Sequence, residues 1–359
     1  MTLALGPREG HPWGMSSSKA KPRSGGVPPA LTMSDVARRA GVAESTVSRA
    51  LADNPLVSED TRKRIQALAK KMGYSINPVA QSLRVQRSRT IAVAVPLVHE
   101  ASQSLSDPFL MSMLAHIADA LAERGYSMLL SKVPVHEDDW IDRFLQPGRA
   151  DGVILIGQSH EHSTINAAAK RGRPLVVWGG RLPDQAYASV GCDNTAGGAM
   201  ATRHLLAQGR RRIAFLGDER LPEIGLRHQG YLQALKAAGV KPEAALRIRT
   251  RFSADDAYSA ISKALAKGLQ FDAVFAASDV IATSALRALG EAGRRVPEDV
   301  AVVGFDDVEL ARHTLPPLTT IRQDIARAAH LLVEMILEGR CDCADSVQMA
   351  PELVLRASA

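Results

Sequence analysis

Beyond residue 90 the chain alternates between short strand-like runs and helix-length amphipathic segments. The strand-like runs are TIAVAV, SMLLSKV, GVILIG, PLVVWG, RIAFLG, AVFAAS and VAVVGF. Segments such as MSMLAHIADALAERG and DDAYSAISKALAKG separate them. This alternation predicts parallel sheets with helices on both faces. Because about 270 residues is long for one doubly wound sheet, we expect two lobes over residues 90–359.

Basic residues are concentrated at the front of the chain. Residues 1–90 carry 15 Lys and Arg against 6 Asp and Glu, a net charge of +9, whereas residues 91–359 have a net charge of −3. Phosphate neutralisation supplies most of the nonspecific affinity of a DNA-binding module, so this asymmetry indicates a polyanionic partner. The alternative is a solvated basic tail. Residues 1–30 fit that alternative, and their Ser, Gly, Pro and Lys content predicts a disordered extension.

Residues 31–76 have the pattern of a small three-helix domain. Thr32 and Asp35 form a capping-box pattern, which predicts a helix from Met33 that ends at Gly41. A second helix is expected over Glu44–Leu51. The turn between them has the three or four residues that a helix-turn-helix requires, and the second helix of that motif points its N-terminal residues at base edges in the major groove.

The third helix of this domain has start and stop signals at both ends. Ser58 is expected to be its N-cap, with acidic residues in the first turn, Lys70 and Lys71 in the last turn, and Gly73 as the stop. Its apolar face is predicted to contain Ile65, Leu68, Ala69 and Met72. Three short helices of this kind can bury one small core together.

Residues 77–89 predict a hinge helix and linker. In NPVAQSLR, Asn77 can cap a helix and Pro78 is at its first position, with an apolar side formed by Val79, Ala80 and Leu83. A helix of barely two turns should not persist alone in water. We expect it to order against the DNA minor groove and a twin helix from a second subunit.

These motifs resemble the LacI/GalR family of bacterial transcription regulators. The resemblance spans residues 32–359 and is carried by TMSDVARRAGVAESTVSRAL, YSINPVAQSLR, DNTAGGAMATRHLLAQGRRRIAFLG, ASDVIATSALRALGEAGRRVPEDVAVVGFDD and PPLTTIRQD. It implies an all-α helix-turn-helix head with a hinge helix, joined to an α/β two-lobed effector domain similar to periplasmic binding proteins. It also implies a dimer on pseudo-palindromic double-stranded operator DNA, in which the residue matching Leu83 kinks the central minor groove.

The resemblance also implies which residues contact DNA. Glu44 and Ser45 match base-reading positions, with Arg49 as a third. Arg can pair with guanine and Glu can accept from the cytosine amino group, so we expect a half-site that contains G·C pairs. The alternative for Arg49 is a plain surface charge. The remaining DNA-binding positions are Thr32, Thr46, Ser48, Ser58, Thr61 and Tyr74 in the head, and Asn77, Val79, Ala80 and Leu83 in the hinge.

Two residues of the head depart from the family pattern. Ala43 stands where the family usually has Ser, and Ala52 stands where it often has Asn. These departures predict that at least one contact to the DNA backbone is missing.

Candidate ligand-binding residues follow directly after predicted strands, where α/β folds place their clefts. Asp306 follows VAVVGF, Ser278 follows AVFAA and Asp193 follows SVGC. By family resemblance, Arg227 and Asp306 match ligand-contacting positions, and Phe252 matches an aromatic that lies against the ligand ring. These groups fit a polyol, because Arg donates, Asp accepts from paired hydroxyls and an aromatic face covers a sugar. A purine would satisfy the same groups.

Two further residues have competing explanations. Trp178, at the end of PLVVW, is a candidate ligand-stacking residue, but a tryptophan at a strand end is as often part of the core. Asp279 also follows AVFAA, which is consistent with a position in the cleft, but an acid before VIATSALRAL is equally expected as a helix N-cap.

The sequence predicts neither an enzyme nor a cofactor or metal site. It contains no G-x-S-x-G elbow, phosphate-binding P-loop, H-E-x-x-H or dinucleotide fingerprint. His160-Glu161-His162 resembles a pair of metal ligands, but a polar loop is the commoner explanation, and the C-x-C of Cys341 and Cys343 lacks a partner pair. A catalytic reading is therefore not supported.

Cysteine content and hydropathy indicate a cytoplasmic location without a membrane span. Three cysteines are too few for a disulfide framework, the N-terminal apolar run is too short for a signal peptide, and no stretch has eighteen consecutive apolar residues. A transport binding protein is disfavoured because the sequence predicts no signal peptide and has a basic head. A nonspecific architectural DNA protein would have no use for a cleft domain.

The combined expectation is a ligand-responsive repressor of carbohydrate uptake or catabolism genes. We expect its effector to be a mono- or disaccharide, with a purine-type corepressor as the alternative. Ligand in the cleft should shift the lobes of a homodimer and change the cost of ordering the hinge segments on DNA. The last strand-like run, SVQMAPELVLRASA, contains no heptads that would form a tetramer.

Overall fold

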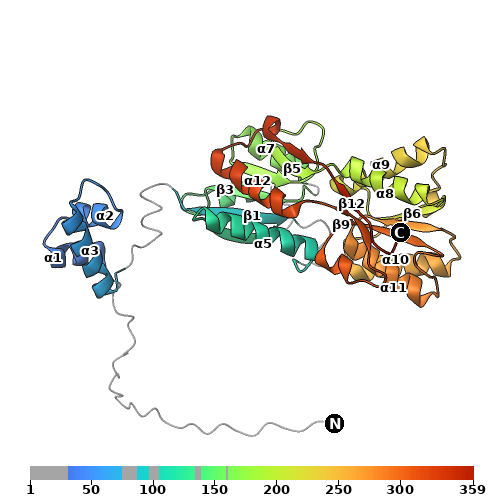
Figure 1. Ribbon diagram of the computed structural model, residues 1–359. Helices are drawn as coiled ribbons and strands as arrows, with labels where there is room; N and C mark the ends of the chain where they lie inside the picture. Colours follow the sequence, from blue (N-terminus) through green and yellow to red (C-terminus); the bar gives the residue numbers. More distant parts are fainter. Residues whose placement is uncertain (1–30, 75–86, 97–104, 134–138, 159–160) are drawn as a thin grey trace, which may run out of the picture. The chain divides into compact units, whose positions relative to one another are not determined.

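The computed structural model describes residues 31–74, 87–96, 105–133, 139–158 and 161–359. The chain divides into two compact units, residues 1–77 and 78–359 (Figure 1). Among the described residues, the first unit contains three helices and the second contains two α/β lobes, each built on a six-stranded sheet. This confirms the predicted fold class of a helical head followed by a two-lobed α/β domain.

The three helices of the first unit have the predicted bounds. They are α1 (Met33–Ala40), α2 (Glu44–Leu51) and α3 (Glu59–Met72). α1 and α3 end at Gly41 and Gly73, whose φ angles of 67° and 70° are in the left-handed region that glycine adopts without steric cost. The shared core consists of Val36, Ala37, Ala40, Val47, Ala50, Val57, Ile65 and Ala69. Val47 and Ala50 anchor one side of α2 in this core, so the other side of α2 is exposed.

The two N-caps predicted from the sequence differ in what their side chains do. Thr32 forms the full capping box: its Oγ1 accepts from the Asp35 amide at 3.3 Å, and the Asp35 carboxylate accepts from the Thr32 amide at 3.0 Å. Ser58 is at the N-cap position of α3, but its hydroxyl donates to Thr61 Oγ1 at 2.9 Å and makes no capping bond to the backbone. The capping role predicted for the Ser58 side chain is therefore wrong.

Thr32→Ala is expected to destabilise the head by about 1 kcal/mol, because the Asp35 amide loses its Oγ1 acceptor and the Asp35 carboxylate loses the hydroxyl donor. Amide hydrogen exchange of α1 in the full chain without DNA measures this loss. Ser58→Ala is the matched control and should have a much smaller effect, since its side chain caps no amide. Equal effects of the two substitutions would contradict the capping argument.

The N-terminal lobe is a parallel sheet in the order β11-β5-β4-β3-β1-β2. Its strands are β1 (Thr90–Pro96), β2 (Ser127–Val133), β3 (Gly152–Ile156), β4 (Leu175–Trp178), β5 (Ala188–Cys192) and β11 (Val347–Met349). Apolar residues of α5 (Pro108–Glu123) and α12 (Ile325–Glu338) pack on one face, and those of α6 (Trp140–Phe144) and α7 (His162–Lys170) pack on the other. The central strands β1, β3 and β4 are therefore covered on both sides.

The C-terminal lobe has a sheet in the order β12-β10-β9-β8-β6-β7. Its strands are β6 (Ile213–Leu216), β7 (Arg247–Ile248), β8 (Ala273–Ala276), β9 (Ala301–Asp306), β10 (Thr319–Arg322) and β12 (Glu352–Val354). The helices around it are α8 (Asn194–Ala207), α9 (Pro222–Ala237), α10 (Ala254–Ala266) and α11 (Asp279–Glu291), with short 3-10 turns at Ala244–Leu246 and Glu309–Arg312 and a third, Cys343–Asp345, before β11. Figure 1 shows α8 and α9 together on one side and α10 and α11 on the other.

The expectation of wholly parallel sheets is wrong at one edge. β12 pairs antiparallel with β10, whereas the other pairings of named strands are parallel. The run SVQMAPELVLRASA is also not one strand. It divides into β11 in the N-terminal lobe and β12 in the C-terminal lobe, with Ala350 and Pro351 between them. Pro351 cannot donate to a ladder, which explains the break.

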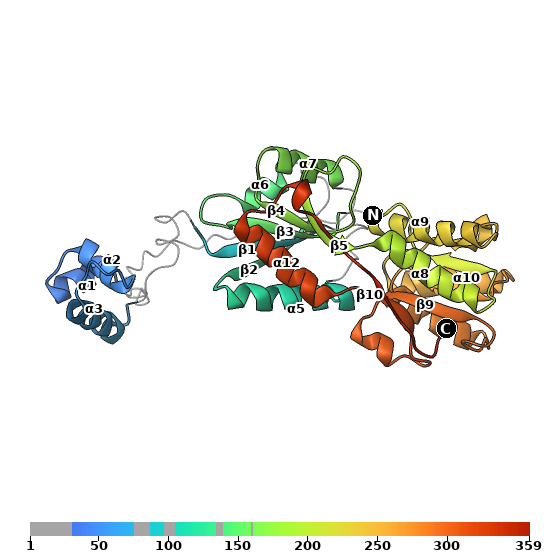
Figure 2. The same cartoon turned by 45° about the horizontal axis from the view of Figure 1, so that its top comes forward.

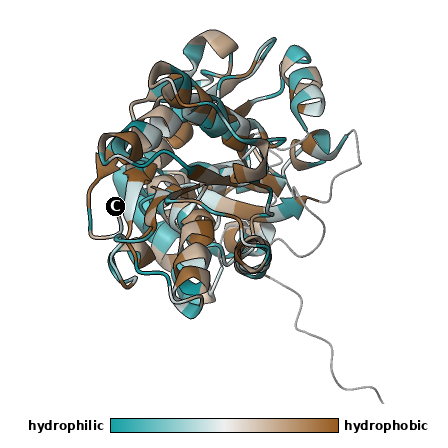
Figure 3. Cartoon of the chain, turned by 90° about the vertical axis from the view of Figure 1, so that its right-hand side faces the viewer, coloured by the Kyte–Doolittle hydropathy of each residue, from teal (hydrophilic) through white to brown (hydrophobic). Residues whose placement is uncertain are grey.

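Three chain segments cross between the lobes (Figure 2). They join β5 to α8, β10 to α12, and β11 to β12. Figure 3 shows hydrophobic residues along the inner strands and hydrophilic residues on outer helices and loops. Of the helices that the structure describes, none combines the length and the apolar character needed to cross a membrane.

Candidate functional site

The exposed side of α2 presents the residues predicted to read bases. Glu44, Ser45 and Arg49 are exposed, while Val47 and Ala50 on the opposite side are buried in the head core. Ala43, the N-cap residue of α2, provides no side-chain cap. An amphipathic helix of this kind can enter a DNA groove without disturbing the core that supports it.

The other predicted DNA-contacting residues of the head are distributed over all three helices and their ends. Thr46 and Ser48 are half-buried on α2, and Thr61 and Tyr74 are half-buried on and after α3. Ser58 is exposed, and the hydroxyl of Thr32 is engaged with Asp35 at 2.7 Å. Basic side chains of α1 and α3 are exposed as well: Arg38, Arg39, Lys63, Arg64, Lys70 and Lys71. The hinge residues Asn77, Val79, Ala80 and Leu83 lie outside the described residues.

A pocket in the second unit is lined by both lobes. Four of the predicted ligand-binding residues, Trp178, Arg227, Phe252 and Asp306, line it together. The other lining residues include two carboxylates and several apolar side chains: Val95, Pro96, Asp107, Phe109, Leu110, Ile156, Gly157, Leu221 and Glu223. The pocket therefore combines aromatic and aliphatic walls with a few charged groups, as small-molecule sites do.

Arg227 is the buried cation of this pocket. Its Nε donates to Asn194 Oδ1 at 2.8 Å, and its Nη1 donates to the Ala277 carbonyl and lies 3.7 Å from Asp306 Oδ1. The guanidinium also lies 3.7 Å from the centroid of the Phe305 ring. These contacts fix the plane of the guanidinium, so its remaining donors have a defined direction.

Two glycines allow α8 and α9 to come close enough to position Arg227. A Cβ on Gly198 of α8 would lie 2.1 Å from the Arg227 carbonyl oxygen, and a Cβ on Gly230 of α9 would lie 2.0 Å from the Thr195 carbonyl oxygen. Any larger residue would separate the helices. Arg227 on α9 would then move away from Asn194 at the start of α8.

Asp306 is the buried carboxylate opposite Arg227. It is the last residue of β9, and its Oδ1 accepts from Gln323 Nε2 at 2.7 Å. Burial raises the pKa of the Asp306 carboxyl well above its ordinary value, and the Arg227 guanidinium acts in the opposite direction. An acceptor that is buried in this way is stabilised by ligand hydroxyl donors.

Asp107 and Glu223 are pocket carboxylates that the sequence did not indicate. Asp107 caps α5, accepting from the amides of Phe109 and Leu110 at 2.9 and 3.1 Å. Glu223 of the C-terminal lobe accepts from the Gln158 amide of the N-terminal lobe at 3.3 Å. Burial raises the pKa of both carboxyl groups. No local pattern separates these two acids from other acids at helix starts, which is why they were missed.

The aromatic side chains occupy different walls of the pocket. The rings of Trp178 and Phe109 have their centroids 6.0 Å apart at an angle of 39°. Trp178 is only 5% exposed and belongs to the N-terminal core, so it is both a core residue and a pocket residue. Phe252 is half-buried against the core of the C-terminal lobe.

Asp193 and Ser278 are not among the pocket-lining residues. Asp193 caps α8 by accepting from the Ala196 amide at 2.9 Å, and Ser278 caps α11 by accepting from the Ile281 amide at 3.3 Å. Ser278 is therefore the N-cap that the sequence assigned to Asp279. Asp279 is the first residue of α11, and burial raises the pKa of its carboxyl to about 7.

The candidate metal ligands are dispersed. His160 lies outside the described residues, Glu161 accepts from Trp140 Nε1 at 3.2 Å, and His162 contacts the Tyr187 hydroxyl at 2.8 Å. Cys341 and Cys343 are free thiols. Over the part of the chain that the structure describes, no three His, Cys, Asp or Glu residues are arranged to hold a metal ion.

The helical head and the two-lobed domain each match a known protein family. A family model described as bacterial regulatory proteins, lacI family, matches residues 32–77, and one for a periplasmic binding protein-like domain matches residues 202–359. The HTH-type transcriptional regulator CelR of Thermobifida fusca is 36% identical over 315 residues, which cover 85% of this chain and 92% of that protein. The chain belongs to the LacI family of bacterial regulatory proteins.

Other LacI-family proteins match over most of the chain. The HTH-type transcriptional repressor CytR of Escherichia coli is 32% identical over 336 residues, covering 92% of this chain and 96% of CytR. A solved structure of the CelR–cellobiose complex has a TM-score of 0.67 at 32% identity and covers 92% of this chain and 100% of that chain. The lac repressor dimer bound to operator and the anti-inducer ONPF has a TM-score of 0.77 at 27% identity, with 92% and 99% covered. These relatives are DNA-binding regulators, and this LacI-family chain is a DNA-binding transcription regulator.

Proposed function

We propose that this LacI-family regulator is a repressor whose affinity for operator DNA is controlled by an uncharged saccharide bound in the pocket. Its targets in this proposal are genes of carbohydrate uptake or catabolism, and it acts in the cytoplasm on the chromosome without an enzymatic activity. The relative CelR, solved in complex with cellobiose, supports a saccharide as effector.

The main support for this proposal is that the charged groups of the pocket include more hydrogen-bond acceptors than donors. Three carboxylates, Asp107, Glu223 and Asp306, and one guanidinium, Arg227, line walls that are otherwise mostly apolar. Carboxylates accept from hydroxyl groups, and aromatic faces cover the apolar side of a sugar ring. Because three carboxyl groups face one guanidinium, the pocket side chains offer few donors to the phosphate of a phosphorylated sugar.

A purine corepressor is the second candidate, since Trp178 and Phe252 provide faces on which a base could stack. A purine offers fewer donors than a polyol to three carboxylates. The carboxylate excess therefore favours the saccharide.

Thermal unfolding of the full chain with a panel of ligands tests the ligand class. At a ligand concentration one hundred times its Kd, a bound effector should stabilise the folded chain by about 2.7 kcal/mol, which raises the Tm by a few degrees. We expect this for at least one neutral mono- or disaccharide, and no shift for its phosphorylated form. A shift only with purines would replace the saccharide by the second candidate.

We propose further that the regulator binds its operator as a homodimer. Large apolar side chains are exposed in both lobes: Met111 and Leu130 in the N-terminal lobe, and Leu310 and Leu315 in the C-terminal lobe. Leu315 is 93% exposed. Contact with a second copy would remove such side chains from water. The relative lac repressor, solved as a dimer on operator, supports this assembly.

A further inference from the structure

The backbone at the end of β9 adopts a conformation that its residues do not favour. Asp306 and Asp307 have φ angles of 120° and 54°, in the left-handed region that non-glycine residues rarely adopt. Such a conformation persists only when surrounding contacts fix it. Because Asp306 is the buried carboxylate of the pocket, whatever fixes this turn also fixes the pocket.

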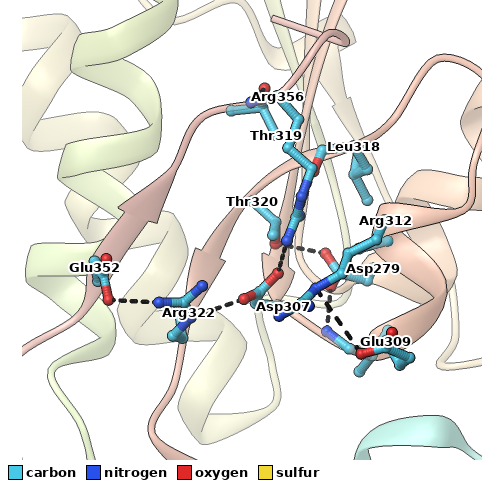
Figure 4. Close-up of polar contacts among 12 residues, drawn as sticks. Asp279, Asp307, Glu309, Arg312, Leu318, Thr319, Thr320, Arg322, Glu352 and Arg356 are labelled. Carbon is cyan, nitrogen blue, oxygen red and sulfur yellow. Dashed lines mark hydrogen bonds and ion pairs between the residues drawn. The ribbon is translucent and has the colours of Figure 1, made fainter.

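Asp307 is held by two arginines. Its carboxylate is 3% exposed, Oδ2 accepts from Arg322 Nε at 2.8 Å, and Oδ1 accepts from Arg356. Arg322 in turn pairs with Glu352 at 2.9 Å. Figure 4 shows Asp307 between Arg322 and Arg356, with Glu352 on the far side of Arg322.

Asp279 holds the next residue of the same turn. Its Oδ2 accepts from the Val308 amide at 2.9 Å, and its Oδ1 accepts from Thr320 Oγ1 at 2.6 Å. A Cβ on Gly304 would lie 2.2 Å from Asp279 Oδ1, so the glycine makes room for this carboxylate. The turn is therefore fixed at Asp307 by ion pairs of its side chain and at Val308 by the hydrogen bond from its amide to the Asp279 carboxylate.

Asp307 is linked through Arg322 to the ends of two of the three segments that cross between the lobes. Arg322 is the last residue of β10, directly before the crossing to α12, and Glu352 begins β12 directly after the crossing from β11. Gln323, which donates to Asp306, lies in the first of these crossings. The pocket carboxylate thus contacts one crossing through Gln323, and its neighbour Asp307 is linked to both crossings through Arg322.

We propose that Asp307 is a positioning residue that, with Arg322 and Arg356, holds the Asp306 carboxylate in the effector pocket and ties it to two of the interlobe crossings. This rests on the proposed function for the identity of the effector. The alternative is that the ion pairs of Asp307 contribute to stability alone.

The test compares Asp307→Asn with Asp299→Asn in the full chain. Asp299 precedes β9 at its opposite end and is also bound by an arginine, Arg295, at 2.7 Å, so it is a matched control in the same lobe. Hydrogen exchange of a peptide that contains Val308 measures how firmly the turn is held, and it requires no ligand. We expect exchange at least tenfold faster in Asp307→Asn and unchanged in Asp299→Asn. Arg322→Met, which removes a partner of Asp307, should repeat the Asp307→Asn result.

Cellobiose affinity, measured by calorimetry, provides the second readout. Asp307→Asn should weaken it at least tenfold, but less than twofold when Asp306→Asn is already present, because the effect acts through Asp306. If Asp307 contributed to stability alone, Asp307→Asn would weaken cellobiose binding by the same factor in the unaltered chain and in Asp306→Asn. Unchanged exchange at Val308, or unchanged cellobiose affinity despite faster exchange, would overturn the proposal.

The two proposals fail in different ways. If the unaltered chain binds neither cellobiose nor any other neutral saccharide, the proposed function is wrong, and the exchange measurement alone decides the role of Asp307. Faster exchange in Asp307→Asn but not in Asp299→Asn would then support the positioning role. If cellobiose binds equally well to the unaltered chain and to Asp307→Asn, the proposed function stands and the positioning role is rejected.

Discussion

Arg227→Met is expected to remove the effector response while leaving operator binding in place. The substitution keeps much of the side-chain length over Phe305 but removes the donors to Asn194 and to Ala277, and leaves Asp306 without its cation. Loss of charged hydrogen bonds in a buried site costs about 3 kcal/mol, which corresponds to a loss of roughly two orders of magnitude in effector affinity.

Operator affinity of Arg227→Met, measured with and without saccharide, separates this effect from unfolding. Without saccharide it should equal that of the unaltered chain within about twofold, a change of less than 0.5 kcal/mol. Arg249→Met, on an exposed arginine of the same lobe outside the pocket, is the control and should keep the response. A normal response in Arg227→Met would show that the pocket is not the effector site.

Arg49→Ala is expected to weaken specific operator binding and to relax base preference at one position of each half-site. Arg49 is exposed on α2, beside Glu44 and Ser45 and opposite the buried Val47 and Ala50. A bidentate arginine–guanine pair contributes about 1–3 kcal/mol of discrimination, so the loss should be roughly 10- to 100-fold on the operator.

The base preference of Arg49→Ala distinguishes base reading from general charge. Binding to operators with each base pair at the affected position should become nearly equal, while nonspecific binding changes little. Lys70→Ala is the comparison, since it removes an exposed positive charge from the end of α3 and should weaken binding to all sequences alike. A uniform loss in Arg49→Ala would mean that Arg49 contacts phosphate.

Local sequence signals predicted the elements of this fold well. The capping box at Thr32 and Asp35 and the glycines at positions 41 and 73 placed α1 and α3, because these signals act within one helical turn. The apolar runs of the central strands are long enough to identify them. β7 and β10 were not among the predicted strand-like runs. The antiparallel direction of β12 was also missed, since only the sheet it joins determines how Glu352–Val354 runs.

The pocket was predictable only in part, because it is made by contacts that are distant in sequence. The Arg227 and Asp306 positions came from motif resemblance, and their 3.7 Å separation depends on the approach of α8 and α9. The interlobe bond of Glu223 to Gln158 spans 65 residues and has no local signature. Asp193 and Ser278 follow strands as expected, but capping uses the side chains of both.

Fluorescence anisotropy of the full chain on labelled DNA from upstream of its own gene measures whether a saccharide controls operator affinity. The titration is carried out at fixed salt, because the phosphate term depends on ionic strength. It is repeated with cellobiose, the rest of a neutral saccharide panel and a set of purines. We predict specific binding whose affinity changes at least tenfold with a neutral saccharide. Specific binding that no saccharide alters, while a purine does, would contradict it.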